Sequence, residues 1–184
     1  MSASSNPVPT SAADREKLLA LLRESRQLFL GSFAGVSDEQ SRRCPAEGCW
    51  SVLDCAEHVA GAETFMLRLL KGPRRSRPAG ALNREEFFWQ RMTDRSRKAV
   101  SPEGGRPRGR FANLEEARKQ FEISRAGTIG FVQENTEDLR STEVTHPLPM
   151  FGDVSAYEMV IIIAKHAERH ALQIEEIRKV LSLH

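Results

Sequence analysis

This chain of 184 residues contains no long apolar run, and its first residues do not have the pattern expected of an N-terminal leader. No hydrophobic stretch approaches the length of about 18 residues that a membrane-spanning helix requires. The first residues, MSASSNP, contain neither a basic start nor an apolar centre, so the sequence does not predict a secretory signal peptide. We therefore expect a cytoplasmic protein that has no membrane partner.

Cysteine is scarce as well. The three cysteines, Cys44, Cys49 and Cys55, are odd in number, and their spacing differs from that of paired zinc-binding motifs. A disulfide framework would need an even set in an oxidising compartment. The pattern therefore predicts reduced thiols, which agrees with a cytoplasmic location.

A large excess of one charge is also absent, because 27 basic residues nearly balance 25 acidic ones. The net charge of +2 gives no reason to expect a nucleic-acid partner. The positive charge is concentrated in residues 71–110, which hold 12 basic and 4 acidic residues. Aromatic residues are not interleaved with these charges as base stacking would require. We expect a solvated, arginine-rich segment that can attract a small anion.

The composition is that of one globular domain. Hydrophobic residues make up 40% of the chain and charged residues 28%, a balance typical of soluble domains. A chain of this length can bury a sizeable core. We expect a flexible N-terminus over residues 1–10 and a single domain over residues 11–184.

Four helix starts can be recognised in the sequence. A capping side chain stands three residues before a carboxylate in Ser11–Asp14, Ser51–Asp54, Asn113–Glu116 and Ser155–Glu158. This arrangement satisfies the free N–H groups at the start of a helix. Each start precedes an amphipathic stretch of roughly 20 to 27 residues, so the sequence predicts an all-α four-helix bundle. The second helix is expected to end at Gly72-Pro73.

The connection between the second and third predicted helices is a long insertion of about 40 residues, which is more than a tight turn needs. We expect it to contain a helix from Asn83 to about Lys98 that lies over the bundle. Its apolar side would consist of Phe87, Phe88, Trp89 and Met92. Residues 145–153 contain two prolines and are expected to be extended.

Two histidines lie on the predicted inner face of the fourth helix. The helical stripe there reads Met159, Ile163, His166, His170, Ile174, Ile177 and Leu181. Side chains four residues apart sit one turn above each other, close enough to bind one metal ion. The stripe of the second helix contains a third histidine and reads Cys55, His58, Ala62, Phe65 and Leu69.

His58, His166 and His170 therefore form a predicted metal site. Three neutral ligands leave a coordination position for water or substrate, and the ion would acidify a bound thiol or water. We expect a divalent ion, first zinc or nickel and then iron, since imidazole suits all three. The alternative is that the histidines are buried structural groups. The other histidines, His146 and His184, are expected to be exposed.

Three other residues have expected roles at or near this site. Cys55 precedes His58 by one turn and is a less favoured fourth ligand, because it would close the site. Trp50 precedes the Ser51 cap and is interpreted as a structural staple of the first helical turn. Tyr157 could border the mouth of the pocket.

Short motifs that together carry a family resemblance run along most of the chain. They are residues 48–60 (GCWSVLDCAEHVA), 107–111 (PRGRF), 113–117 (NLEEA), 151–152 (FG) and 164–174 (AKHAERHALQI). In their order and spacing the chain resembles the DinB-like family of metalloenzymes, which includes bacillithiol and related thiol transferases. The resemblance implies an up-down-down-up bundle, often dimeric. It also implies a divalent metal bound at the positions of His58, His166 and His170.

The resemblance leaves the reaction open. The first hypothesis is a metal-dependent enzyme that activates a low-molecular-weight thiol for S-transfer. A metal-dependent hydrolase is the second, although Glu57, Glu63 and Glu168 are each interpreted as solvated or supporting groups and the catalytic residues stay unknown. A non-catalytic, dimeric metal- or ligand-binding module is the third. The basic insertion predicts a small-molecule partner, such as an anionic thiol, because arginines bind carboxylates and phosphates.

Overall fold

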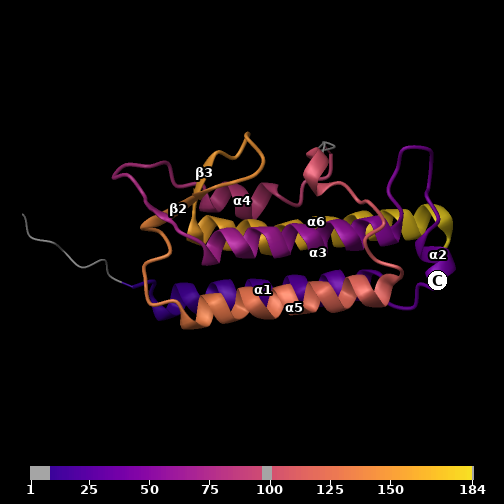
Figure 1. The fold of residues 1–184 in the computed structure, drawn as a ribbon, viewed down its shortest axis with the longest axis horizontal. Helices are drawn as coiled ribbons and strands as arrows, with labels where there is room; N and C mark the ends of the chain where they lie inside the picture. Colours follow the sequence, from indigo (N-terminus) through magenta and orange to yellow (C-terminus); the bar gives the residue numbers. More distant parts are fainter. Residues whose placement is uncertain (1–8, 97–100, 184) are drawn as a thin grey trace, which may run out of the picture.

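The computed structural model describes residues 9–96 and 101–183. Its main elements are the four predicted long helices, which pack as a bundle (Figure 1). They are α1 (Ala12–Ser32), α3 (Val52–Lys71), α5 (Leu114–Glu134) and α6 (Ala156–Leu181). The predicted all-α four-helix bundle is therefore confirmed. No helix of the described part of the chain is long and apolar enough to cross a membrane.

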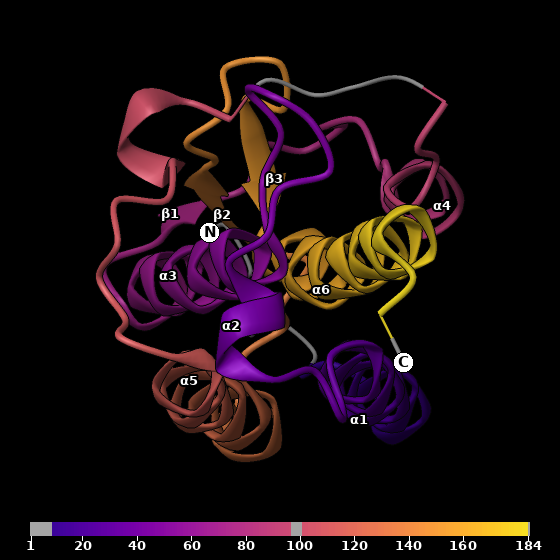
Figure 2. The ribbon, with the colours of Figure 1, turned by 90° about the vertical axis from the view of Figure 1, so that its right-hand side faces the viewer.

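The helices follow the up-down-down-up order. The colours of Figure 1 show that α1 and α6 run in one direction and that α3 and α5 run in the other. Viewed along the bundle, the four helices occupy the corners of a square, with α3 diagonally opposite α1 (Figure 2). Each helix packs against two others, so α3 contacts both α5 and α6, and α1 contacts the same pair. The contact between α3 and α6 is antiparallel.

All four predicted caps are present. The side chains of Ser11, Ser51, Asn113 and Ser155 each accept a hydrogen bond from the backbone N–H three residues later. Such a cap stabilises a helix by about 1 kcal/mol. At the other end, α3 stops at Lys71, directly before Gly72-Pro73 as predicted.

The helix in the insertion is shorter than predicted. α4 spans Glu85–Arg91 instead of residues 83–98, of which 97–100 lie outside the described residues. The Asp94 carboxylate accepts a hydrogen bond from the Ser96 N–H, and this local turn competes with a further helical turn. Phe88 is fully buried while Phe87 is half exposed, so α4 packs on α6 through part of its expected apolar side.

Three short strands were not predicted. They are β1 (Arg75–Ser76), β2 (Thr142–Thr145) and β3 (Asp153–Ser155), and they form an antiparallel sheet in the order β1-β2-β3. Arg75 lies opposite Glu143, and Val144 opposite Val154. The sheet ties the start of the insertion to the start of α6. Two smaller elements among the described residues are α2 (Asp38–Ser41) and the 3₁₀ turn η1 (Glu103–Gly105).

Most of the N-terminal segment and the last residue lie outside the residues that the structure describes. Of the N-terminus that was expected to be flexible, residues 1–8 are outside the described residues, as is His184. Thr10 is buried, and its hydroxyl accepts a hydrogen bond from the Leu139 N–H. The chain is thus attached to the bundle two residues before α1 begins.

A buried ion pair lies between the helices. Arg125 of α5 and Glu63 of α3 are both at most 1% exposed, and two guanidinium N–H groups donate to the two carboxylate oxygens at 2.6 and 2.9 Å. A third N–H group donates to the Leu22 carbonyl. Burial raises the pKa of Glu63, and the charge and hydrogen bonds of Arg125 act in the opposite direction by lowering it. The pair connects three helices at the centre of the bundle.

His146 is buried, so the prediction of an exposed side chain was wrong. Only 5% of the residue is exposed, because the chain after β2 folds back over it. The ring packs on Phe151 with centroids 4.8 Å apart, and Nδ1 accepts a hydrogen bond from the Leu148 N–H. Burial lowers the pKa of His146 from 6.5 to about 4.

Removing Arg125 should destabilise the protein strongly. In Arg125→Met, Glu63 stays buried without its cation, so we expect a loss of about 3–5 kcal/mol in the free energy of unfolding. The double variant Arg125→Met, Glu63→Leu removes both charges and should be markedly more stable than the single variant. Urea unfolding measures all three proteins. Equal losses in the single and double variants would contradict this interpretation.

His146 should make stability depend on pH. Its folded pKa of about 4 lies below its ordinary value of 6.5, so the unfolded chain binds the proton first as pH falls. The stabilisation is complete above about pH 6.5 and is lost progressively toward pH 4, with about 2 kcal/mol gone at pH 5. The control is His146→Asn, which does not titrate. Parallel curves of unfolding free energy against pH for the two proteins would refute the prediction.

Candidate metal centre

The fold brings the three predicted histidines together. His58 comes from α3, and His166 and His170 come from α6. One ligand atom from each lies within 4.8 Å of the other two. The two Nε2 atoms of His58 and His166 are 3.0 Å apart. The three histidines meet because α3 and α6 pack antiparallel (Figure 1). This contact places the first half of α3, which carries His58, beside the middle of α6, which carries His166 and His170.

A backbone carbonyl fixes the tautomer of His58. Its Nδ1 lies 2.5 Å from the oxygen of Gly105 in η1. A carbonyl only accepts hydrogen bonds, so Nδ1 must carry the proton and Nε2 must carry a lone pair. That lone pair faces the other two histidines. His58 therefore presents the atom that a metal ligand uses, and its other nitrogen has the kind of partner that orients such ligands.

His170 provides a second indication of a ligand. Its Nδ1 is buried and has no hydrogen-bond partner within the part of the chain that the structure describes. A buried polar atom without a partner costs about 1–3 kcal/mol. A divalent ion bound to this nitrogen would remove that cost. The three histidines thus fit the divalent ion that their spacing along the two helices predicts.

The three imidazoles are neutral. Burial lowers the pKa of His58 and holds the pKa values of His166 and His170 well below 6.5, and the neighbouring histidines lower both further. Metal binding requires the unprotonated ring. The site is thus in the state that binds a cation at neutral pH.

Trp50 forms one wall of the site, which the sequence analysis missed. Its ring centroid is 4.8 Å from that of His58 and 5.9 Å from that of His170, and it lies nearly parallel to the His170 ring. The indole also packs against the neighbouring apolar cluster, in keeping with a structural role. Its position directly before the Ser51 cap was the available signal, because the chain must turn back there over the first turns of α3.

Cys55 does not join the cluster. Its side chain is fully buried and packs among apolar residues, and burial raises the pKa of its thiol well above the ordinary value. The group of close ligand atoms contains the three histidines without Cys55. The alternative of a fourth protein ligand therefore gains no support.

The three carboxylates considered as bases are all engaged elsewhere. Glu57 is 1% exposed and accepts hydrogen bonds from the chain at Arg108 and Arg110. Glu63 pairs with Arg125. Glu168 pairs with Lys165 at 2.7 Å. The sequence analysis expected each carboxylate to be either solvated or a group that supports its neighbours. Glu57 and Glu63 are buried, which agrees with the second alternative.

Tyr157 is not at the site. It stands nine residues before His166 and is 1% exposed. The Arg140 guanidinium lies 3.7 Å from its ring centroid, and burial raises the pKa of the hydroxyl to about 12. It is a core residue of the sheet end of the bundle, so the suggestion that it borders the pocket was wrong.

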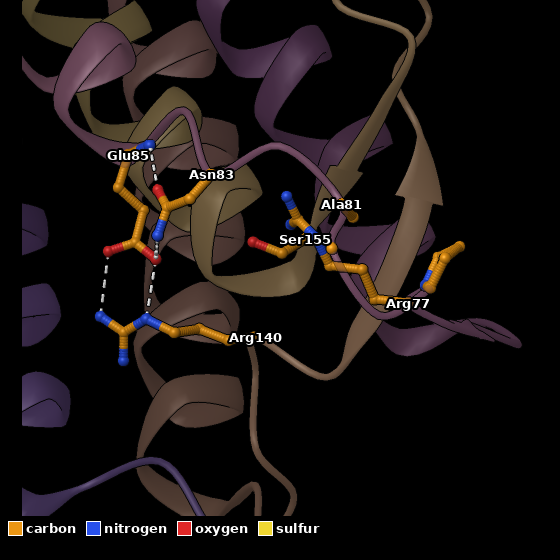
Figure 3. Close-up of a pocket in the computed structure, with 8 residues that line it drawn as sticks. Arg77, Ala81, Asn83, Glu85, Arg140 and Ser155 are labelled. Atoms are coloured by element: carbon orange, nitrogen blue, oxygen red, sulfur yellow. Dashed lines mark hydrogen bonds and ion pairs between the residues drawn. The ribbon is translucent and has the colours of Figure 1, made fainter.

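Two cavities flank the bundle. One, at the start of α6, has a volume of about 220 Å³ and is lined by Arg77, Pro78, Gly80, Ala81, Asn83, Glu85, Arg140 and Ser155 (Figure 3). Its two arginines are paired with Glu158 and Glu85. The other, of about 370 Å³, lies at the start of α3 and is lined by Arg42, Ser51, Leu53, Asp54, Glu57, Gly109, Phe111 and Ala112. The second cavity adjoins the helical turn that carries His58.

Similar proteins share this fold. A crystal structure of TT2238, a four-helix bundle protein, is 20% identical and has a TM-score of 0.58, covering 88% of this chain and 98% of that one. The structure of YfiT from Bacillus subtilis, described as a probable metal-dependent hydrolase with an unusual four-helix bundle topology, is 12% identical with a TM-score of 0.61, covering 99% and 93%.

Sequence comparison identifies relatives as well. The uncharacterized protein YuaE of Bacillus subtilis (strain 168) is 22% identical over 161 residues, which are 88% of this chain and 97% of YuaE. The model of the DinB superfamily matches residues 21–174. The chain therefore belongs to the DinB superfamily.

Proposed function

We propose that this protein is a metal-dependent enzyme whose divalent ion is bound by His58, His166 and His170. The observation that carries the proposal is the cluster of three neutral imidazoles, of which His58 and His170 are buried and His166 is partly buried, and in which His170 Nδ1 has no partner within the described structure. Zinc or nickel is the expected ion, with iron as a further option. Such an ion would lower the pKa of a bound thiol or water.

The reaction we propose is S-transfer from a low-molecular-weight thiol. A general base assists hydrolysis by metal-bound water, and the three carboxylates near the histidines are held by Arg108, Arg110, Arg125 and Lys165. A free thiol already has a much lower pKa than water, so on binding a metal it would release its proton to solvent and depend less on such a base. The engaged carboxylates therefore favour thiol chemistry.

We also propose that the thiol or its acceptor is anionic. Three arginines lie close enough to the cluster to lower the pKa values of its histidines: Arg110 acts on His58, and Arg95 and Arg169 act on His170. Arg110 and Arg95 are ion-paired with Glu57 and Glu176, so the anion that we propose would share these guanidinium groups with the two carboxylates, through its carboxylate or phosphate oxygens.

Hydrolysis is the second candidate function. YfiT, whose fold this chain shares, is described as a probable metal-dependent hydrolase. The same three histidines could serve that reaction, with water in place of the thiol. A binding module without turnover is the remaining alternative.

A cytoplasmic homodimer is the form in which we propose the protein acts. Apolar side chains are exposed on two neighbouring helices, with Leu28 of α1 at 54% and Val180 of α6 at 67%. Burial of such residues in a second copy would stabilise a dimer. Analytical ultracentrifugation at micromolar concentration distinguishes the dimer from a monomer.

Metal binding should depend on the three histidines. Protein purified without tag or chelator is expected to contain about one divalent ion per chain, and the variant with His58, His166 and His170 all changed to alanine should contain none. An ion present at 100 times its Kd should stabilise the natural protein by about 2.7 kcal/mol. Elemental analysis and thermal unfolding check both results.

The control for this experiment is His146→Asn, which removes a buried histidine outside the cluster and should retain the ion. Absence of metal from the natural protein, even after reloading, would contradict the proposed function. The same holds if the triple variant retained the metal.

The two candidate reactions differ in their response to thiols. With cobalt(II) in the site, mercaptoacetate should produce a sulfur-to-cobalt charge-transfer band and should bind several-fold more tightly than 2-mercaptoethanol, because its carboxylate can meet an arginine. The absorption titration measures both affinities. No band with either thiol, together with cleavage of an activated ester, would favour the hydrolase instead.

A further inference from the structure

The carboxylate of Glu57 holds a loop in place. It lies next to His58 in α3 and is 1% exposed. Its Oε1 accepts hydrogen bonds from the Arg108 N–H at 2.6 Å and from Arg110 Nε at 2.9 Å, and its Oε2 accepts one from the Arg110 N–H at 2.8 Å. Hydrogen bonds to an ionised acceptor are among the strongest in proteins. The residue thus fixes the end of the 103–110 loop.

The other end of the same loop contacts the metal cluster. Gly105 closes the turn η1, and its carbonyl oxygen accepts a hydrogen bond from His58 Nδ1 at 2.5 Å. The 103–110 loop is therefore attached to α3 at two consecutive residues, Glu57 and His58. A shift of the loop would change the partner that sets the tautomer and ring orientation of His58.

Gly61 supplies room for this attachment. A Cβ atom at Gly61 would lie 2.9 Å from Nη2 and 3.0 Å from Nη1 of Arg110, so the guanidinium rests on the helix backbone one turn after Glu57. Glycine inside a helix costs about 1 kcal/mol relative to alanine. The cost is offset here by space for the arginine that binds Glu57.

We infer that Glu57 is a positioning residue for the metal centre: it holds the 103–110 loop so that the Gly105 carbonyl keeps His58 as the Nδ1–H tautomer and directs Nε2 toward the ion. This inference rests on the proposed metal binding. It assigns to Glu57 an effect on the ligand geometry without contact with the ion or the substrate.

Glu158 offers a matched control. It is also buried, and it accepts hydrogen bonds from the backbone N–H groups of Arg84 and Ser155 and from the Arg77 guanidinium. It holds a different segment of the insertion, eight residues before His166 in α6. Glu57→Gln and Glu158→Gln therefore make the same chemical change at two buried carboxylates that bind loops, and only one of those loops touches a histidine of the cluster.

The experiment compares the two variants with the natural protein in the cobalt(II) form. Both variants should unfold at lower temperature. Glu57→Gln alone should weaken cobalt binding, by about 10–100-fold as is typical when the partner of a metal ligand is disturbed, and should shift the visible d–d absorption. A purely structural role would lower stability and leave affinity and spectrum as in Glu158→Gln.

A measurement on the natural protein is independent of whether the variant folds. Nitrogen-15 NMR of the metal-free protein should report protonated Nδ1 and unprotonated Nε2 at His58. The Nε2–H tautomer there, or a folded Glu57→Gln with unchanged affinity and spectrum, would overturn the inference while leaving the metal site intact. If the natural protein bound no cobalt, the proposed function would fall together with the inference.

Discussion

Three imidazoles at the contact between α3 and α6 impose a condition on the rest of the molecule, because each buried nitrogen needs a partner. Burial keeps His58, His166 and His170 neutral, so they cannot be satisfied as cations in ion pairs. One nitrogen of His58 has the Gly105 carbonyl, whereas His170 Nδ1 has no partner among the described residues. A divalent ion meets this condition with the nitrogens that face one another.

The topology of the bundle provides the cover for this cluster. Because α3 and α5 run in the same direction, the chain must return along the length of a 20-residue helix, about 30 Å, before α5 can begin. A short turn cannot make that return. The insertion does so across α3 and α6 (Figure 2), and this route brings Gly105 to His58 and α4 onto α6. The connection required by the fold therefore also encloses the histidines.

Much of the fold could be predicted from local signals. The caps at Ser11, Ser51, Asn113 and Ser155 act on their own helices, and the spacing of His166 and His170 follows from helical geometry alone. The inward stripe of α6 is buried at Met159, Ile163, Ile174 and Ile177. These features depend on residues that are near in sequence, which is why periodicity revealed them.

The parts that escaped prediction depend on contacts between distant segments. Phe65 continues the predicted stripe of His58 but is 47% exposed, so the expected inward face of α3 does not extend to this residue. The burial of His146 requires the loop to fold back, and the contact of Gly105 with His58 joins residues 47 positions apart. Glycine has no side chain from which such a role could be inferred. The match of the DinB superfamily establishes the family but not these contacts.

X-ray absorption spectroscopy at the edge of the bound metal tests the central claim most directly, because it reports the type and number of the atoms around the ion. In the zinc form, the account predicts three imidazole nitrogens at about 2.0–2.1 Å with any remaining ligand a light atom from solvent. A sulfur neighbour at about 2.3 Å in protein free of added thiol would point to a cysteine ligand. That result, or fewer than three imidazoles, would contradict a centre built from His58, His166 and His170.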